Sequence, residues 1–266
     1  MIRKIRKVTL AALAVLTLSA CDETRDCGGA PAQKTEIEGD LPKLGLMTSL
    51  PIYWSLDADI ANLAQGNGEK PWQRQLLEKQ FKLVPLDTLT PIPGFSPDEP
   101  ETDPLAGLDR LAVIQPRGLS PADNVALDEW VRAGGHLLIA LDPMLTGDYD
   151  LPLGDPRRPV DMAMVPPVVS RWGLAGGVNL GQPRKVSYAQ LPSGSVPLLM
   201  WGESRVVVVD GGLNGCRTHE SLALAHCDNV GEGTVTYLHD AAVFEHEELV
   251  GENGEGVKAL LNFAFQ

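Results

Sequence analysis

The chain has 266 residues, 44% of them hydrophobic, and a formal net charge of −13 at pH 7. This length and composition allow one large α/β domain, or two small ones, with a substantial hydrophobic core. An acidic chain is repelled by nucleic acids and by anionic lipid surfaces, so the overall charge argues against both as partners.

The first residues have the pattern of a secretory signal. Basic residues at positions 3, 4, 6 and 7 precede an apolar stretch, 8–18, that is too short to span a bilayer. The junction Leu18-Ser19-Ala20-Cys21 resembles the bacterial lipobox, in which the signal is cut before a cysteine that carries a diacylglycerol. We therefore expect residues 1–20 to be removed and Cys21 to be the lipid attachment site. The alternative is an ordinary secreted protein that begins at Cys21.

The residues after Cys21 predict where the protein is held. Asp22 resembles the signal that retains enteric lipoproteins in the inner membrane, so we expect a lipid-anchored protein in the bacterial cell membrane that faces the periplasm. Residues 21–41 are polar and predict a flexible linker, which includes Cys27.

From residue 42 onward, strand and helix patterns alternate. Three buried strands are predicted for KLGLMTSLP, KLVPLD and DRLAVIQP, and a helix that starts at Pro71 is predicted between the first two. A second helix is well marked, because Ser120 can cap it, Pro121 suits its first position and Gly134-Gly135 can end it. The apolar segment HLLIALDP then predicts a central strand. This alternation predicts a mostly parallel sheet flanked by helices.

The C-terminal third has a different pattern. Beyond Gly173 the segments RKVSYAQL, VPLLMWG, SRVVVVD and GTVTYLHD predict short strands, with antiparallel additions to the sheet. Before them, Pro166-Pro167 must break the helical pattern of MAMVPPVVSRWGL. A last helix is predicted in GEGVKALLNFAF. We expect residues 42–266 to form a single α/β domain.

Cys216 and Cys227 are close in sequence, and the signal directs them to an oxidising compartment. We therefore predict a disulfide that closes the loop between them. The alternative makes Cys216 a nucleophile with His219 nearby, but a nucleophile elbow needs glycine two residues to either side, and Asn214 and Thr218 stand there.

The run DRLAVIQPRGLSPADNVALDEWVRAGGHLLIALDP resembles the periplasmic auxiliary component family of ABC-type transport systems, which includes a gliding-motility component. LPLGDPRRP with VVSRWGL extends the resemblance, and the C-terminal GEGTVTYLHDAAVFEHEELVGENGEGVKALLNF resembles a related family of unknown function. The resemblance implies a flavodoxin-like or class I glutamine-amidotransferase-like fold. In those enzymes a nucleophile sits in a sharp turn after a central strand. Here Asp142, Pro143 and Met144 follow the strand, so the resemblance implies a fold without that chemistry.

Candidate ligand residues follow the predicted strands. Ligands of open α/β sheets bind outside the carboxyl ends of strands, so Gln115, Asp142 and Asp240 are predicted to share a possible ligand crevice. The alternative is that Asp142 caps the loop before Pro143. We predict no catalytic residues and no cofactor.

Two further groups of polar residues have a structural and a functional interpretation. His239-Asp240 with the segment 245–248, EHEE, could supply metal ligands, but the spacing fits no known site and we predict no metal. Arg157-Arg158 could clamp a carboxylate or a phosphate, and the alternative is a surface ion pair.

Three functions remain open. The first is a membrane-anchored, non-catalytic accessory or partner-binding component of an ABC-type transport or cell-envelope system, with the ATPase and permease or another envelope protein as partner and no nucleic acid. The second is a periplasmic lipoprotein that binds a small ligand or glycan. The third is an envelope hydrolase, which needs paired carboxylates or a nucleophile with its base.

Overall fold

The computed structural model describes residues 41–58, 68–96, 98–181, 185–199, 202–207, 215–219 and 223–266. The predicted signal peptide, the lipid attachment site Cys21 and the linker up to residue 40 lie outside the described residues, as does Cys27. The described residues belong to one unit, Asp40–Gln266.

A seven-stranded sheet in the order β2-β1-β3-β4-β11-β10-β9 organises the described part of the chain. The first five strands in this order pair in parallel, whereas β10 and β9 are antiparallel additions at one side. Numbered along the chain, the five parallel strands have the order 2-1-3-4-5 of flavodoxin-like folds. The prediction of a mostly parallel α/β sheet with antiparallel additions is confirmed. The strands are β1 (Lys43–Thr48), β2 (Lys82–Pro85), β3 (Arg110–Ile114), β4 (His136–Ala140), β9 (Cys216–Thr218), β10 (Leu224–Val230) and β11 (Gly233–Leu238).

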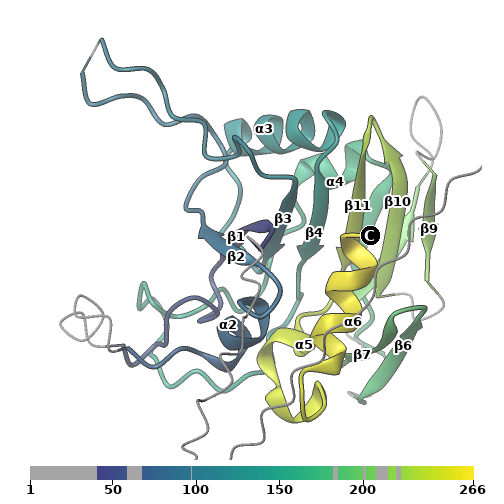
Figure 1. Ribbon diagram of the computed structural model, residues 1–266. Helices are drawn as coiled ribbons and strands as arrows, with labels where there is room; N and C mark the ends of the chain where they lie inside the picture. Colours follow the sequence, from purple (N-terminus) through teal and green to yellow (C-terminus); the bar gives the residue numbers. More distant parts are fainter. Residues whose placement is uncertain are drawn as a thin grey trace, which may run out of the picture. The chain divides into compact units, whose positions relative to one another are not determined.

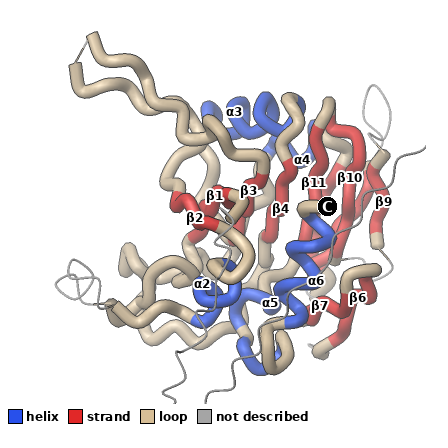
Figure 2. Tube along the Cα trace, in the orientation of Figure 1, coloured by secondary structure: helices blue, strands red, loops and turns tan. Residues whose placement is uncertain are grey.

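Helices cover both faces of this sheet (Figure 1; Figure 2). One hydrophobic core joins α2, α5 and α6 to the sheet, and a second core joins α3 and α4 to the opposite face. The helices are α2 (Trp72–Leu77), α3 (Pro121–Arg132), α4 (Pro167–Arg171), α5 (Ala242–Glu245) and α6 (Glu255–Ala264), with a 3-10 turn, η1, at Glu247–Leu249.

The sequence of β4 shows why both faces need cover. Leu137 and Ile139 belong to the core under α3, whereas Leu138 and Ala140 belong to the core under α6. Successive side chains of a strand point to opposite faces, so an uninterrupted apolar strand must be buried on both sides.

The start of α3 is fixed as the sequence predicts. The Ser120 hydroxyl accepts a hydrogen bond from the Asp123 backbone N–H at 3.0 Å, and the Asp123 carboxylate accepts from the Ser120 backbone N–H at 3.0 Å. This reciprocal pair satisfies two N–H groups that have no partner within the helix. The other carboxylate oxygen accepts from the Leu89 N–H at 2.8 Å, so one side chain also anchors the loop after β2.

The C-terminal third departs from the sequence prediction in two respects. The last predicted strand, β11, is not an addition at the rim, because it pairs in parallel with β4 and completes the central sheet. The segment between the two cysteines is not simply a loop, since Cys216 and Cys227 lie opposite each other on β9 and β10. Two antiparallel strand pairs stand apart from the main sheet: β5 (Leu174–Val178) pairs with β8 (Gly202–Val206), and between them in the chain β6 (Ser187–Leu191) and β7 (Gly194–Leu198) form a hairpin.

A disulfide joins Cys216 to Cys227, as predicted, across a sequence separation of 11 residues. Cys227 is fully buried in the core under α3. The bond therefore ties the short outer strand β9 to β10.

We expect replacement of both cysteines by alanine to lower the free energy of unfolding by about 3 kcal/mol, which is the chain-entropy effect of opening a loop of this size. Urea denaturation of the two proteins measures the difference. Reductant should lower the urea midpoint of the native protein and leave the midpoint of the variant unchanged. Equal urea midpoints for the two proteins without reductant would contradict the prediction.

Candidate functional site

The three residues predicted to share a crevice lie at the edge of the sheet that is formed by the carboxyl ends of its parallel strands. Gln115 and Asp142 follow β3 and β4, and Asp240 follows β11. The structure brings them together but buries them, with exposed fractions of 0%, 3% and 2%. Their polar atoms bond to protein groups, so the three residues form a buried network at the ends of the central strands.

Gln115 connects three segments of this edge. Its side-chain oxygen accepts from the Asp142 N–H at 2.7 Å, and its side-chain nitrogen donates to the carbonyls of Asp142 at 3.1 Å and Val160 at 2.8 Å. Its backbone carbonyl accepts from the Ser49 hydroxyl at 2.5 Å. All polar atoms of the Gln115 side chain are thereby engaged.

The backbone of Gln115 has a φ of +44°, which a residue with a side chain rarely adopts. Such conformations cost roughly 1–3 kcal/mol and often occur at functional sites. The residue with the strained backbone therefore follows β3. The family resemblance had instead compared the turn after β4, at Asp142, with the nucleophile turn of the related enzymes. An amide that is fully hydrogen-bonded occupies the strained position, and an amide is not a nucleophile.

Asp142 ties the loop after β4 to the end of β11. One carboxylate oxygen accepts from the Met144 N–H at 2.7 Å, and the other accepts from the Ala241 N–H at 2.9 Å. The first bond is the loop cap that was the structural alternative for Asp142. Burial, followed by the nearby charge of Asp240, raises the pKa of Asp142 to about 8.

Asp240 has a similar structural role. Its two carboxylate oxygens accept from the backbone N–H groups of Ala242 and Leu199, both at 2.8 Å, so it begins α5 and holds the end of the β6–β7 hairpin. Its neighbour His239 bonds through Nδ1 to the Tyr237 hydroxyl at 2.7 Å. Burial lowers the pKa of His239 to about 4.

Close packing surrounds His239. A Cβ at Gly202 would lie 1.8 Å from its carbonyl oxygen, and a Cβ at Gly176 would lie 2.2 Å from its ring. Glycine at these two positions lets the β5–β8 strand pair approach the end of β11.

The acidic segment that begins with Glu245, the last residue of α5, holds the loop around residues 146–149. Glu245 accepts from the Gly147 N–H at 2.8 Å and from the Tyr149 hydroxyl at 2.9 Å, and the His246 ring contacts the Thr146 hydroxyl at 2.6 Å. Burial and the charge of Glu245 raise the pKa of Tyr149, which keeps its hydroxyl a donor. The described residues contain no cluster of histidine, cysteine and carboxylate groups suited to a metal ion.

The two adjacent arginines have local partners. Arg157 pairs with Asp155 at 2.9 Å, and Arg158 pairs with Asp161 at 2.7 Å. Arg158 also donates to the carbonyls of Tyr149 and Leu151, both at 2.8 Å. The surface ion pair, which was the alternative to an anion clamp, is what the structure contains.

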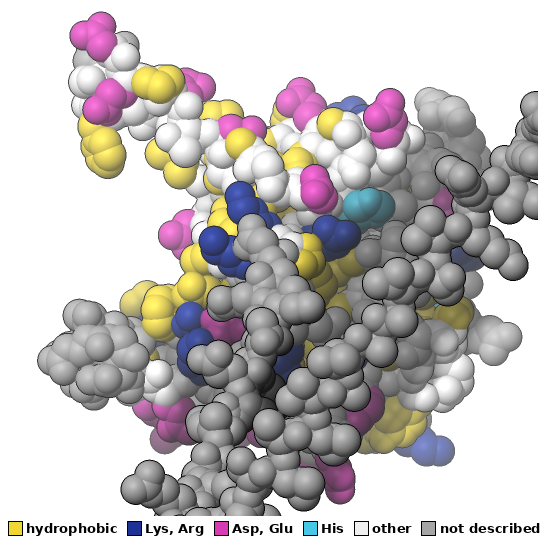
Figure 3. Space-filling model, in the orientation of Figure 1, with side chains coloured by type: hydrophobic (Ala, Val, Ile, Leu, Met, Phe, Trp, Pro, Cys, Tyr) yellow, Lys and Arg dark blue, Asp and Glu magenta, His cyan; other side chains and the backbone are white. Residues whose placement is uncertain are grey.

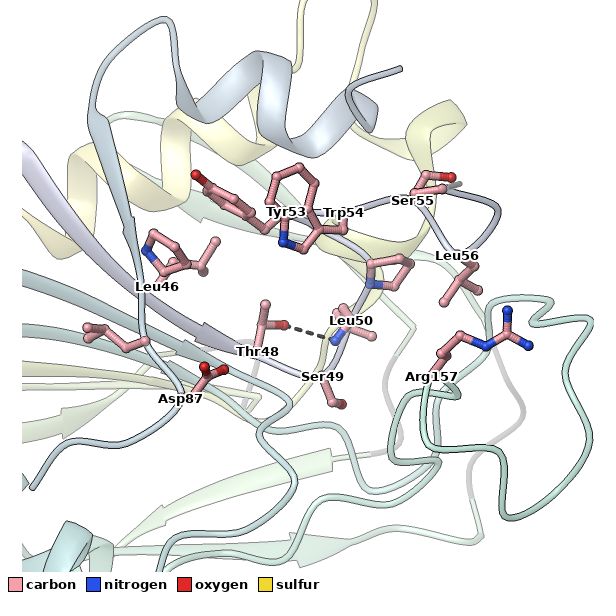
Figure 4. Close-up of a pocket in the computed structure, with 14 residues that line it drawn as sticks. Leu46, Thr48, Ser49, Leu50, Tyr53, Trp54, Ser55, Leu56, Asp87 and Arg157 are labelled. Carbon is pink, nitrogen blue, oxygen red and sulfur yellow. Dashed lines mark hydrogen bonds between the residues drawn. The ribbon is translucent and has the colours of Figure 1, made fainter. Parts of the chain in front are cut away.

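A pocket of about 340 Å³ opens at the carboxyl ends of β1 and β2 (Figure 4). Tyr53 and Trp54 lie along one side of it, and Asp87 and Arg157 lie at opposite ends. It lies on the β2 side of β1, and none of its lining residues belongs to β3, so it is next to the crevice between β1 and β3 where the strand order reverses and is not within it. The lining residues are Leu46, Thr48, Ser49, Leu50, Pro51, Tyr53, Trp54, Ser55, Leu56, Ala58, Pro85, Leu86, Asp87 and Arg157.

An arginine holds the two aromatic rings in place. The Arg74 guanidinium lies 4.1 Å from the centroid of Tyr53 and 5.1 Å from that of Trp54. Arg74 itself pairs with Glu78 at 2.7 Å and donates to the Tyr53 carbonyl at 3.1 Å. Trp54 is nevertheless 51% exposed, so it offers an aromatic surface beside the pocket.

Of the candidate residues named from the sequence, Arg157 alone lines this pocket, and the pocket itself was not predicted. Tyr53 and Trp54 stand in an irregular loop and match no motif, and Arg74 belongs to an ordinary helix face. The available signal was a pair of adjacent aromatic residues directly after the first parallel strand, in a chain with only 5% aromatic residues.

Comparisons with known proteins assign no family. No family model matches the chain. No curated protein matches it. In the described residues, no helix is long and apolar enough to cross a membrane.

Three solved structures have weak overall similarity to the chain. The exo-beta-1,4-mannosidase Op5Man5 from Opitutaceae bacterium strain TAV5 is 16% identical with a TM-score of 0.45, over 85% of this chain and 36% of its own. A beta-galactosidase from Bacillus circulans sp. alkalophilus is 11% identical with a TM-score of 0.43, over 84% of this chain and 31% of its own. The cytoplasmic protein STM3548 from Salmonella typhimurium is 13% identical with a TM-score of 0.41, over 84% of this chain and 99% of its own. The chain spans about a third of each glycosidase, and likeness at this level assigns no function.

The raised pKa of Asp142 makes stability depend on pH. Below pH 3.8, the ordinary pKa, the Asp142 carboxyl is protonated in both the folded and the unfolded protein. As the pH rises from 3.8 toward 8, the unfolded protein loses this proton and the folded protein keeps it, so the free energy of unfolding falls. We expect the free energy of unfolding to fall between pH 6.5 and 8, by at most about 1.4 kcal/mol per pH unit. The opposing effect of His239 is confined to the range below pH 6.5.

Urea denaturation at several pH values in this range tests the slope. Asp142→Asn keeps one acceptor and loses the other, so it should be less stable at pH 6.5 but should have a flatter profile. If the variant and the native protein show the same slope, Asp142 is not the group that titrates.

Proposed function

We propose that the chain is a membrane-anchored lipoprotein whose α/β domain is a non-catalytic accessory component of an ABC-type transport or cell-envelope system. The lipobox pattern at Cys21 and the family resemblance support this proposal. The observation that carries it is the turn after β3, where Gln115 occupies the strained position and is bonded to Asp142 and Val160. A residue held in this way stabilises the fold and has no free group for catalysis.

The neighbouring hydroxyl is also engaged. Ser49 follows β1 at the same edge, and its oxygen donates to the Gln115 carbonyl at 2.5 Å and accepts from the Val160 N–H at 3.1 Å. It is 9% exposed. The side chains of Ser49 and Gln115 are therefore committed to holding the loops at this edge, and neither is free for covalent chemistry.

The first test is affinity capture of the lipidated protein from crosslinked native membranes, followed by mass spectrometry. We expect an ABC ATPase and its permease to be recovered with the native chain and to be lost with Cys21→Ala, which cannot be anchored. Equal recovery of the transporter with both proteins would show that the lipid is not needed, and recovery of no transporter would count against the accessory role.

The pocket favours a second candidate, a lipoprotein that binds a small polar ligand or glycan. Its volume lies at the lower end of the range for ligand sites. An aromatic face next to a carboxylate and a guanidinium suits a sugar, because the ring offers apolar contact while Asp87 and Arg157 offer hydrogen bonds.

Soluble peptidoglycan fragments are a suitable probe for this candidate. At a concentration of about 100 Kd, we expect them to stabilise the native protein by about 2.7 kcal/mol in thermal unfolding. Trp54→Ala should weaken binding about tenfold or more, whereas Tyr188→Ala, which removes a similarly exposed aromatic from β6, should leave it unchanged. Equal affinity of the two variants would exclude this pocket as the binding site.

A further inference from the structure

Each of the first three parallel strands begins with a basic residue. Lys43 starts β1, Lys82 starts β2 and Arg110 starts β3. Lys43 and Lys82 are register partners, and Arg110 is paired with His136, the first residue of β4. Because the strands are parallel, these residues lie at the same edge of the sheet, opposite the pocket; Lys43 and Lys82 alternate onto the face under α3, and Arg110 onto the face under α6. We call Lys43, Lys82 and Arg110 the basic edge.

The basic edge is available for contact. Both lysines are exposed and Arg110 is half-buried, and none of the three takes part in an ion pair among the described residues. Other arginines, such as Arg132 and Arg158, are paired with carboxylates. Figure 3 shows dark blue side chains gathered beside a histidine on this face of the molecule.

Acidic groups at this edge do not neutralise it by direct pairing. Asp109 precedes β3 and Glu232 precedes β11, and both are exposed. Neither forms an ion pair with the basic edge. Positive charge at β1 and β2 therefore stands out in a chain whose net charge is −13.

The proposed tether joins the domain at the same place. About 20 residues of sequence separate Cys21 from the start of β1 at Lys43, and a chain of that length reaches at most roughly 75 Å. An anchor at Cys21 therefore connects to the domain at the start of β1, which belongs to the basic edge. Electrostatic attraction acts over about 8 Å at physiological salt, so the nearest charges decide how the domain meets the surface.

We propose that the basic edge contacts anionic phospholipid headgroups of the membrane that holds Cys21. This inference rests on the proposed lipid anchor. The contact orients the domain with its parallel strands pointing away from the bilayer, so that the pocket beside Tyr53 and Trp54 faces the periplasm. The net charge of the chain argues against binding to anionic lipid through the domain as a whole, so the contact is confined to the basic edge.

Lysine labelling on vesicles tests the orientation with the native lipidated chain. On vesicles containing phosphatidylglycerol, we expect Lys43 and Lys82 to be acetylated at least about fivefold more slowly than on phosphatidylcholine vesicles, since each basic residue near an anionic surface contributes on the order of that factor. Lys185, which is exposed elsewhere, should react equally on both. Salt at about 1 M, where the screening length is about 3 Å, should remove the difference.

A pair of variants links the protection to the basic edge. Arg110→Gln retains both reporter lysines and should reduce their protection severalfold, whereas Arg205→Gln removes an exposed arginine from β8 and should have no effect. Equal labelling on the two kinds of vesicle, or protection that survives high salt, would overturn the proposal.

Mass measurement of the intact chain separates this inference from the anchor on which it rests. A chain without lipid on Cys21 refutes the anchor. An acylated chain whose lysines react equally on both kinds of vesicle refutes the basic edge alone.

Discussion

The structure depends on buried hydrogen bonds that join the carboxyl ends of the central strands. When a parallel sheet is covered by helices on both faces, the loops that follow its strands are partly buried. Each polar group in them that lacks a hydrogen-bond partner costs about 1–3 kcal/mol. Gln115 and Asp142 meet this constraint together: the amide bridges β3 to the loop after β4, and the carboxylate bridges that loop to the start of α5. The left-handed backbone of Gln115 is tolerated because these bonds fix it from several sides.

Much of the fold follows from local sequence patterns. The apolar segment of β4 and the cap formed by Ser120 with Asp123 were predictable, because burial and capping depend on residues close in the chain. The strand β10 was not, since its sequence LAHCDNV carries polar residues that only its position beside β11 explains. Nor could the aromatic wall of the pocket be predicted, because Arg74 reaches Tyr53 across 21 residues of chain.

The candidate site shows the same division. The sequence placed Gln115, Asp142 and Asp240 correctly at one edge, because the ends of parallel strands converge. Their burial could not be predicted, since it comes from the loop that carries Val160 and from the β6–β7 hairpin, which approach from distant parts of the chain.

A parallel sheet also has two chemically different ends. Here, one end carries cationic strand starts and the other carries a pocket, so the proposed membrane contact and the proposed ligand site lie at opposite ends of the sheet.

The outermost strands of the sheet are short. At one side β2 has four residues and ends in Pro85, which cannot donate to a further strand, and at the other side β9 has three residues and is bonded covalently to β10. Open sheet edges recruit other chains, and confinement to a surface brings neighbouring copies close together. With the proposed lipid anchor, a sheet blunted at both margins would resist strand-to-strand aggregation under such crowding, and many copies would share one membrane as separate molecules.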